Sequence, residues 1–211
     1  MPQLNANETV YSQVPQSYVE LRVNIDFKAQ DRELKTIAVT SAGRGEGRTT
    51  SAVNLAIAYA QAGKKTILVD ADIRNPGVHL YFGEPNQRGL TNILNRTSEA
   101  AKAVSLSGMK NLSLLYAGPE VDNGSDLLSS QEMDELLQEL KREFDIIILD
   151  APPVIGHIDS KIISAKSNGV VFVVQHGSVK RWKAKRAKDE LERVKVHFLG
   201  VLMNRDRTAK G

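Results

Sequence analysis

Residues 39–50 read Val-Thr-Ser-Ala-Gly-Arg-Gly-Glu-Gly-Arg-Thr-Thr, and they follow a short apolar stretch that is typical of a buried strand. Residues 49–62 then form an apolar segment of helix length. A strand, a glycine-rich loop and a helix in this order are typical of a phosphate-binding loop. Gly43, Gly45 and Gly47 allow successive main-chain N–H groups to point at a polyphosphate, with the positive end of the next helix behind them. The alternative is a plain glycine turn, and the acidic residues further along the chain argue against it.

The loop departs at two positions from the pattern G-x-x-x-x-G-K-[ST]. Ala42 stands where the pattern has its first glycine, which the loop tolerates if the backbone φ of Ala42 is negative. Arg48 stands where the pattern has lysine, and Thr49 stands where its hydroxyl binds magnesium. A guanidinium is planar and wider than an ammonium. Arg48 is therefore expected to keep the positive charge of the loop but not its position.

Three aspartates follow apolar strand-like segments. Asp70 and Asp72 are two residues apart, so in a strand their side chains share a face, where they repel each other unless a cation lies near. This pair indicates a magnesium site or a general base, and a solvated turn is the alternative. Asp150 ends the aliphatic run that begins at residue 145, and ligands bind at the carboxyl ends of strands in open α/β sheets. Asp150 is thus expected to approach the loop as a third acid.

The composition of the chain limits its function. A chain of 211 residues with 41% hydrophobic residues can form one large α/β core. The absence of cysteine excludes disulfides, iron–sulfur ligation and thiol catalysis, and fits a reducing cytoplasm. Neither an apolar run long enough to span a membrane nor a signal peptide is found in the sequence. The net charge of +3 is too small to argue for a nucleic-acid partner.

The segment pattern predicts an α/β fold, with a mostly parallel sheet and helices on both of its faces. Residues 1–14 are expected to be a mobile arm, residues 15–205 one domain, and residues 206–211 a short basic tail without tyrosine. The expected strands are residues 34–41, 65–70, 111–117, 145–150, 168–175 and 198–204. The expected helices are residues 17–27, 49–62, 89–94, 98–104, 129–144 and 179–194.

The expected helix 179–194 has an unusual charge order. Its cations come first and its acids follow, which opposes the helix dipole. An anion near the start of the helix could compensate. It could be a phosphate, an acidic protein surface, or anionic lipid with Trp182 as an apolar anchor. The alternative is a solvated face whose charges are screened by salt. The cations are Lys180, Arg181, Lys183, Lys185, Arg186 and Lys188.

Three segments together, residues 41–50, 67–76 and 146–153, resemble the bacterial tyrosine kinases of capsule and exopolysaccharide synthesis. Residues 74–82 and 89–94 are similar to that family too, and the resemblance covers roughly residues 15–205. It implies a P-loop NTPase fold related to the partition ATPases. It also implies protein-tyrosine phosphorylation with ATP and Mg²⁺ as cofactors.

Roles follow from this resemblance for individual residues. Thr49 corresponds to a direct magnesium ligand, and Asp70 and Asp150 to the acids that hold the ion and its waters. Asp72 corresponds to the base that accepts the proton of the tyrosine hydroxyl, Arg48 to the catalytic loop cation, and Asn204 to the contact with adenine. ATP would be held by Gly43, Arg44, Gly45, Glu46, Gly47, Arg48, Thr49 and Thr50.

Several positions depart from the family pattern. The five tyrosines, at 11, 18, 59, 81 and 116, form no C-terminal cluster. In the ring-forming motif of a Glu and two Arg, the chain has Gln16, Val19 and Arg22. Gly43 stands where partition ATPases carry a signature lysine.

Two functions therefore remain. The first is a tyrosine kinase that Arg48 attenuates. It would act on a protein tyrosine substrate, with a separate transmembrane adaptor of the polysaccharide co-polymerase type. It would be cytoplasmic, held at the inner face of the cell membrane by that partner, and able to associate with further copies of itself as a homo-oligomer. The alternative is a nucleotide-binding regulatory subunit of a polysaccharide export complex with weak or absent kinase activity.

Overall fold

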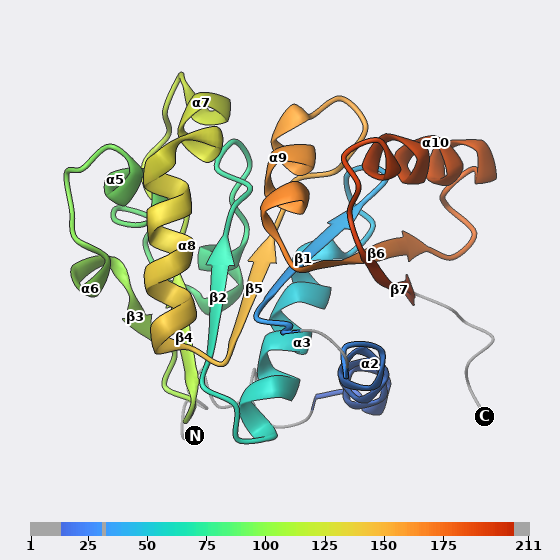
Figure 1. Cartoon of the computed structure of the whole chain (residues 1–211), viewed down its shortest axis with the longest axis horizontal. Helices are drawn as coiled ribbons and strands as arrows, with labels where there is room; N and C mark the ends of the chain where they lie inside the picture. The colour runs from blue at the N-terminus through green and yellow to red at the C-terminus, as the bar shows by residue number, and fades with distance from the viewer. Residues whose placement is uncertain (1–13, 31–32, 205–211) are drawn as a thin grey trace, which may run out of the picture.

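A computed structural model describes residues 14–30 and 33–204, so the predicted tail and, except for Val14, the predicted arm lie outside the described residues. Its centre is a seven-stranded sheet in the order β3-β4-β2-β5-β1-β6-β7 (Figure 1). Every pairing is parallel except that of β3 with β4. The predicted α/β class with a mostly parallel sheet is confirmed. The strands are β1 Thr36–Ser41, β2 Thr66–Asp70, β3 Ser105–Leu106, β4 Leu112–Leu115, β5 Ile146–Asp150, β6 Gly169–Gln175 and β7 Phe198–Asn204.

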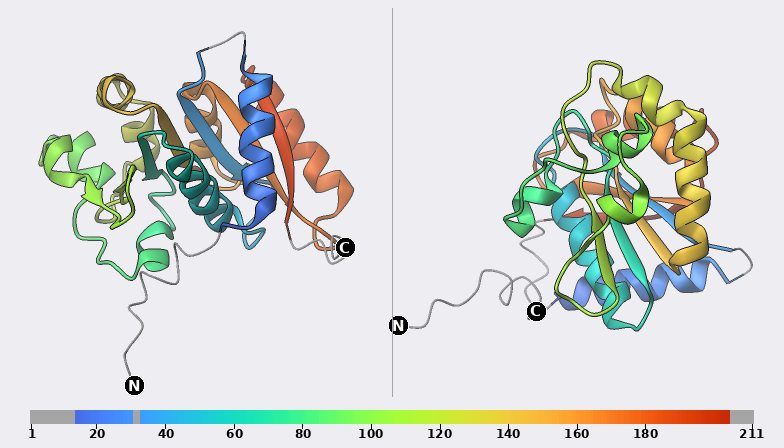
Figure 2. Two further views of the ribbon diagram at one scale, coloured as in Figure 1. Left: turned by 90° about the horizontal axis from the view of Figure 1, so that it is seen from below. Right: turned by 90° about the vertical axis from the view of Figure 1, so that its left-hand side faces the viewer.

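Helices cover both faces of the sheet (Figure 2). One apolar core contains residues of α8, α9 and α10, and a second contains residues of α2, α3 and α4. Strands β1, β2 and β5 are buried at every position, which explains their continuous aliphatic sequences. The helices are α2 Gln16–Lys28, α3 Arg48–Gln61, α4 Val78–Phe82, α5 Leu90–Leu94, α6 Ala100–Ala103, α7 Gly124–Ser129, α8 Gln131–Glu143, α9 Ile158–Lys166 and α10 Arg181–Glu192.

Most predicted elements are present, with shifted ends. The helix expected at residues 129–144 is α8, and its N-cap is Ser130, whose hydroxyl accepts from the Met133 amide at 3.4 Å. A separate short helix, α7, ends just before that cap. Sequence patterns also missed α4, α9 and the two-residue strand β3. Short elements give too few residues for a period to be visible.

Helix α2 packs on the body of the molecule through α3. Ile25 is fully buried, and Tyr59 of α3 donates a hydrogen bond to Asp26 at 2.9 Å. Burial, reinforced by the charge of Asp26, raises the pKa of Tyr59, so this hydroxyl remains a donor. Arg22 pairs with Asp26 of the same helix at 3.0 Å. The helix predicted at residues 17–27 is present as α2, and it packs on the body of the molecule.

The strand order brings the three sequence motifs to one edge of the sheet. Strand β5 lies between β1 and β2, so the loop after β1 and the residues after β2 and β5 emerge side by side. Asp70 and Asp150 are direct register partners on β2 and β5. The carboxyl ends of parallel strands form the usual ligand site of such sheets. Within the part of the chain that the structure describes, no helix has the length and apolar character to cross a membrane.

Candidate functional site

The loop between β1 and α3 has the backbone of an anion cradle. Gly45 and Gly47 adopt left-handed φ values of 77° and 86°, and α3 begins directly after Gly47. Ala42 is not among the described non-glycine residues of positive φ, so the condition for replacing glycine there is met. The N-terminal N–H groups of α3 have no intrahelical acceptors and favour an anion.

A cleft of about 380 Å³ opens above this loop. Residues of the glycine loop line it together with Thr49 and Thr50, which begin α3, and with Asp72 and Asn75 from the turn after β2. Main-chain donors, hydroxyls and an acid around one opening are the groups that a nucleotide polyphosphate and its cation require.

Arg48 bridges two of the three predicted acids. Its Nε donates to Asp150 Oδ1 at 2.8 Å, and its Nη2 donates to Asp72 Oδ2 at 2.7 Å. Asp150 is fully buried and the Asp72 side chain is 4% exposed. The guanidinium is therefore directed at the acids and is held by them. This agrees with the expectation that arginine keeps the charge of the loop but not the position of lysine.

Asp70 lies beside this bridge but is held by main chain. Its Oδ2 accepts from the Gly77 and Val78 amides, both at 2.9 Å, and its Oδ1 accepts from the Asp72 amide at 3.2 Å. Burial, followed by the charge of Asp150, raises the pKa of Asp70 to about 8, although the Val78 and Gly77 amides oppose the shift. Asp70 thus orients the turn after β2 and adds a proton-binding group to the site.

Asp150 retains an unused oxygen. Its Oδ2 is buried and has no hydrogen-bond partner among the described residues. Burial raises the pKa of Asp150, and the charge of Arg48 opposes this shift. The described residues contain no group of three or more His, Cys, Asp or Glu side chains placed to hold a metal ion. Magnesium, however, is commonly bound by one or two carboxylates together with substrate phosphates. The orphaned oxygen of Asp150 fits this arrangement, and the Thr49 hydroxyl interacts with the same carboxyl group.

Asn204, at the end of β7, supports the loop from outside. Its Nδ2 donates to the Glu46 carbonyl at 2.8 Å, and a Cβ on Gly47 would lie 1.8 Å from that nitrogen. The Glu46 side chain is 4% exposed. Burial raises its pKa, and the Gly43 amide and the charge of Lys183 oppose the shift. The contact of Asn204 with adenine stays a prediction, but its place at the loop is established.

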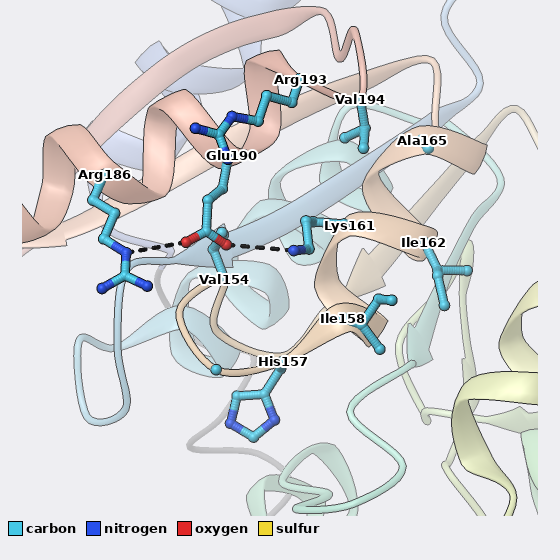
Figure 3. Close-up of a pocket in the computed structure, with 11 residues that line it drawn as sticks. Val154, His157, Ile158, Lys161, Ile162, Ala165, Arg186, Glu190, Arg193 and Val194 are labelled. Atoms are coloured by element: carbon cyan, nitrogen blue, oxygen red, sulfur yellow. Dashed lines mark hydrogen bonds and ion pairs between the residues drawn. The ribbon is translucent and has the colours of Figure 1, made fainter.

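Other polar residues lie away from this cleft. Arg74 pairs with Asp159 of α9 at 2.8 Å, and His79 Nδ1 is buried without a hydrogen-bond partner in the described chain. A larger hollow of about 760 Å³ lies between α9 and α10. Figure 3 shows Glu190 there between Arg186 and Lys161. Glu190 Oε1 lies 3.2 Å from Arg186 Nε, and Glu190 Oε2 lies 3.4 Å from Lys161 Nζ. That hollow lacks the glycine loop and the strand-end acids, so we assign the functional site to the smaller cleft.

Comparison with known proteins identifies the family. The family model described as "AAA domain" matches residues 34–181. Tyrosine-protein kinase YwqD of Bacillus subtilis (strain 168) is 40% identical over 195 residues, covering 92% of this chain and 82% of the relative. The chain belongs to the bacterial tyrosine-protein kinase family. Tyrosine-protein kinase CpsD of Streptococcus pneumoniae is 34% identical over 189 residues, which is 89% of this chain and 82% of that protein.

Solved structures agree with this assignment. The chimerical protein CapA2B2 has a TM-score of 0.91 and 33% identity, with 97% of this chain and 92% of that chain covered. The septum site-determining protein MinD of Pyrococcus horikoshii OT3, solved with Mg-ADP, has a TM-score of 0.71 and 20% identity over 84% of this chain and 72% of that chain. At that identity the likeness to MinD shows the fold alone. These comparisons confirm that the chain resembles this kinase family, as its three sequence motifs predicted.

Three site features were not predicted from the sequence. Asn75 lines the cleft, the Glu46 side chain is buried beneath the loop, and Lys183 of α10 reaches Gly43. The reversed charge order of the helix carrying Lys183 was the available signal, but it could not say which anion the helix faces. The individual roles in catalysis, metal binding and cofactor binding stay predictions.

Proposed function

We propose that this chain is an ATP-dependent protein-tyrosine kinase of capsular or exopolysaccharide synthesis, with activity attenuated by Arg48. The observation that carries the proposal is the convergence of Asp72 and Asp150 with the glycine loop at one edge of the sheet. Family membership supplies the reaction class. Phosphoryl transfer depends mainly on positioning and charge neutralisation, and such a site is suited to both.

Each group has a defined task in this proposal. The main chain of residues 43–50 and the N-terminus of α3 hold the polyphosphate of ATP. Thr49 and the free oxygen of Asp150 would hold Mg²⁺, with Asp70 acting through its waters. When bound, Mg²⁺ neutralises charge on the phosphates. Asp72 accepts the proton from the tyrosine hydroxyl, which requires its Oδ2 to be released from Arg48.

Attenuation follows from the same bridge. The guanidinium of Arg48 occupies one oxygen of Asp150 and one of Asp72, and both contacts are shorter than 3 Å. A magnesium ion at the free oxygen of Asp150 would be repelled by this positive charge, and Asp72 cannot act as a base at Oδ2 while Arg48 holds that oxygen. Lysine would present a single point charge on a slimmer stem and could extend along the loop.

The test is transfer of label from radioactive ATP to tyrosine, in the presence of Mg²⁺ and the cytoplasmic tail of the proposed transmembrane adaptor. We expect slow labelling by the wild type, faster labelling by Arg48→Lys, and none by Asp72→Asn. No label on any tyrosine of this chain or the partner, under conditions where ATP binds, would refute kinase activity.

The second candidate is a nucleotide-binding regulatory subunit that controls a polysaccharide export complex through its ATP-bound form. The double ion pair of Arg48 favours it, because the acids are engaged before any ligand arrives. Unchanged turnover in Arg48→Lys would show that arginine is not the brake. Attachment to the inner face of the membrane through the adaptor, and self-association, belong to both candidates.

A further inference from the structure

The basic start of α10 lies over the start of the phosphate-binding loop. Lys183 stands in the first turn of α10, and its Nζ is 2.3 Å from the point that a Cβ on Gly43 would occupy. Glycine at position 43 therefore leaves the space that this ammonium group fills. The contact joins residues that are far apart in sequence, at the loop that the proposed function assigns to ATP.

Lys183 reaches this place together with a buried acid of the loop. Glu46 Oε1 lies 3.1 Å from the same point on Gly43, and its Oε2 is buried without a hydrogen-bond partner in the described chain. The charge of Lys183 acts on the Glu46 carboxyl and lowers its pKa against the effect of burial. Lysine has a flexible four-carbon stem and three donors, and no described ion pair holds Lys183 to Glu46.

Such a cation has a place in the site because Arg48, at the position of the pattern's lysine, is engaged elsewhere. Arg48 donates to Asp150 and Asp72, so its guanidinium is directed at the strand-end acids. The cations at the start of α10 also oppose the helix dipole, which is unfavourable unless an anion lies near. A polyphosphate in the loop would be that anion.

We propose that Lys183 is a phosphate-binding residue of the nucleotide site and supplies from α10 the positive charge that Arg48 does not. Its ammonium donates to an oxygen of the bound polyphosphate across the start of the loop, beside Gly43. This inference rests on the nucleotide binding of the proposed function but not on tyrosine transfer.

The experiment compares Lys183→Ala with Lys185→Ala, a control on the same helix with an exposed side chain. Dissociation constants for fluorescent ATP, ADP, AMP and adenosine are measured with Mg²⁺ on the full chain. We expect roughly tenfold weaker ATP binding in Lys183→Ala, as for loss of one charge-assisted hydrogen bond. Lys185→Ala should stay within about twofold, because the charge of an exposed side chain is largely screened by solvent and salt. Loss for ATP alone identifies the terminal phosphate, and loss for both ATP and ADP identifies an inner one.

Measurements in a Glu46→Gln background separate binding of phosphate by Lys183 from neutralisation of Glu46 by the same lysine. If Lys183 only neutralises Glu46, the double variant Glu46→Gln/Lys183→Ala should bind ATP as Glu46→Gln does, which would overturn the inference. Equal losses in the two lysine variants, or an equal loss for adenosine, would also overturn it.

The outcome for the kinase proposal is read separately. Absent tyrosine labelling with Lys183-dependent ATP affinity refutes the kinase and supports this inference. Tyrosine labelling by the wild type, with ATP affinity unchanged in Lys183→Ala, supports the kinase and overturns this inference. A wild-type chain that binds no ATP overturns both.

Discussion

Replacing Arg48 by methionine should destabilise the protein strongly in the absence of magnesium. The Arg48 side chain is 11% exposed, and it bridges two carboxylates that are 4% and 0% exposed. Methionine keeps much of the apolar stem but leaves two buried acids without their partner. Breaking a buried ion pair from one side costs about 3–5 kcal/mol. For a chain of this length, the midpoint of thermal unfolding should fall by roughly 6–20 °C.

The assay is thermal and urea unfolding followed by circular dichroism, with and without Mg²⁺. Arg44→Met is the matched control, because Arg44 lies in the same loop with an exposed side chain. Its free energy of unfolding should change by less than about 0.5 kcal/mol. Added Mg²⁺ should stabilise Arg48→Met more than the wild type, since no guanidinium then lies beside Asp150 to repel the ion.

Two results would refute this reasoning. Equal stability losses in the Arg48 and Arg44 variants would mean that the buried bridge contributes nothing particular. A Mg²⁺ response no larger in Arg48→Met than in the wild type would mean that the charge of Arg48 does not weaken binding of the ion at Asp150.

Three further sets of substitutions test the rest of the site. Asp150→Ala should abolish the gain in nucleotide affinity that Mg²⁺ gives, whereas Asp72→Ala should lower the rate of tyrosine transfer more than it lowers nucleotide affinity. Equal losses of nucleotide affinity in the two variants, measured by titration, would contradict this division of roles. The folded-state pKa of Asp70 is raised to about 8, so its contribution to stability is complete below the ordinary pKa of aspartate, about 4, and is lost as pH rises toward 8. Asp70→Asn should flatten the fall of the unfolding free energy over this range by at most about 1.4 kcal/mol per pH unit, and an unchanged slope in urea titrations would count against the assignment. Gly47→Ala should cost about 1–3 kcal/mol from its φ of 86° alone, and more because its methyl group would meet a side-chain amide at 1.8 Å. Gly45→Ala, at a φ of 77° with nothing within 4 Å, should pay only the backbone cost, and a larger loss there than at Gly47 would show that the close contact is unimportant.

The sequence alone determined the architecture and the family. Aliphatic runs ending in Asp70 and Asp150 are typical of buried parallel strands, and a glycine loop between a strand and a helix is typical of phosphate binding. The glycine loop, the aspartates and the Thr49 hydroxyl could each be located from the sequence, because each motif lies within a few residues of the end of its own strand. Short helices such as α4 and α9 escaped, since packing rather than periodicity stabilises them.

Tertiary structure alone decided how the charges pair. Whether Arg48 lies along the loop or turns to Asp150 depends on a carboxylate 102 residues away. The approach of Lys183 to Gly43 likewise depends on the position of α10 over the sheet. Local sequence fixes which groups a segment carries, but the partner of a buried charge is set by long-range packing, because only packing removes water and leaves the charge to find a protein counterpart.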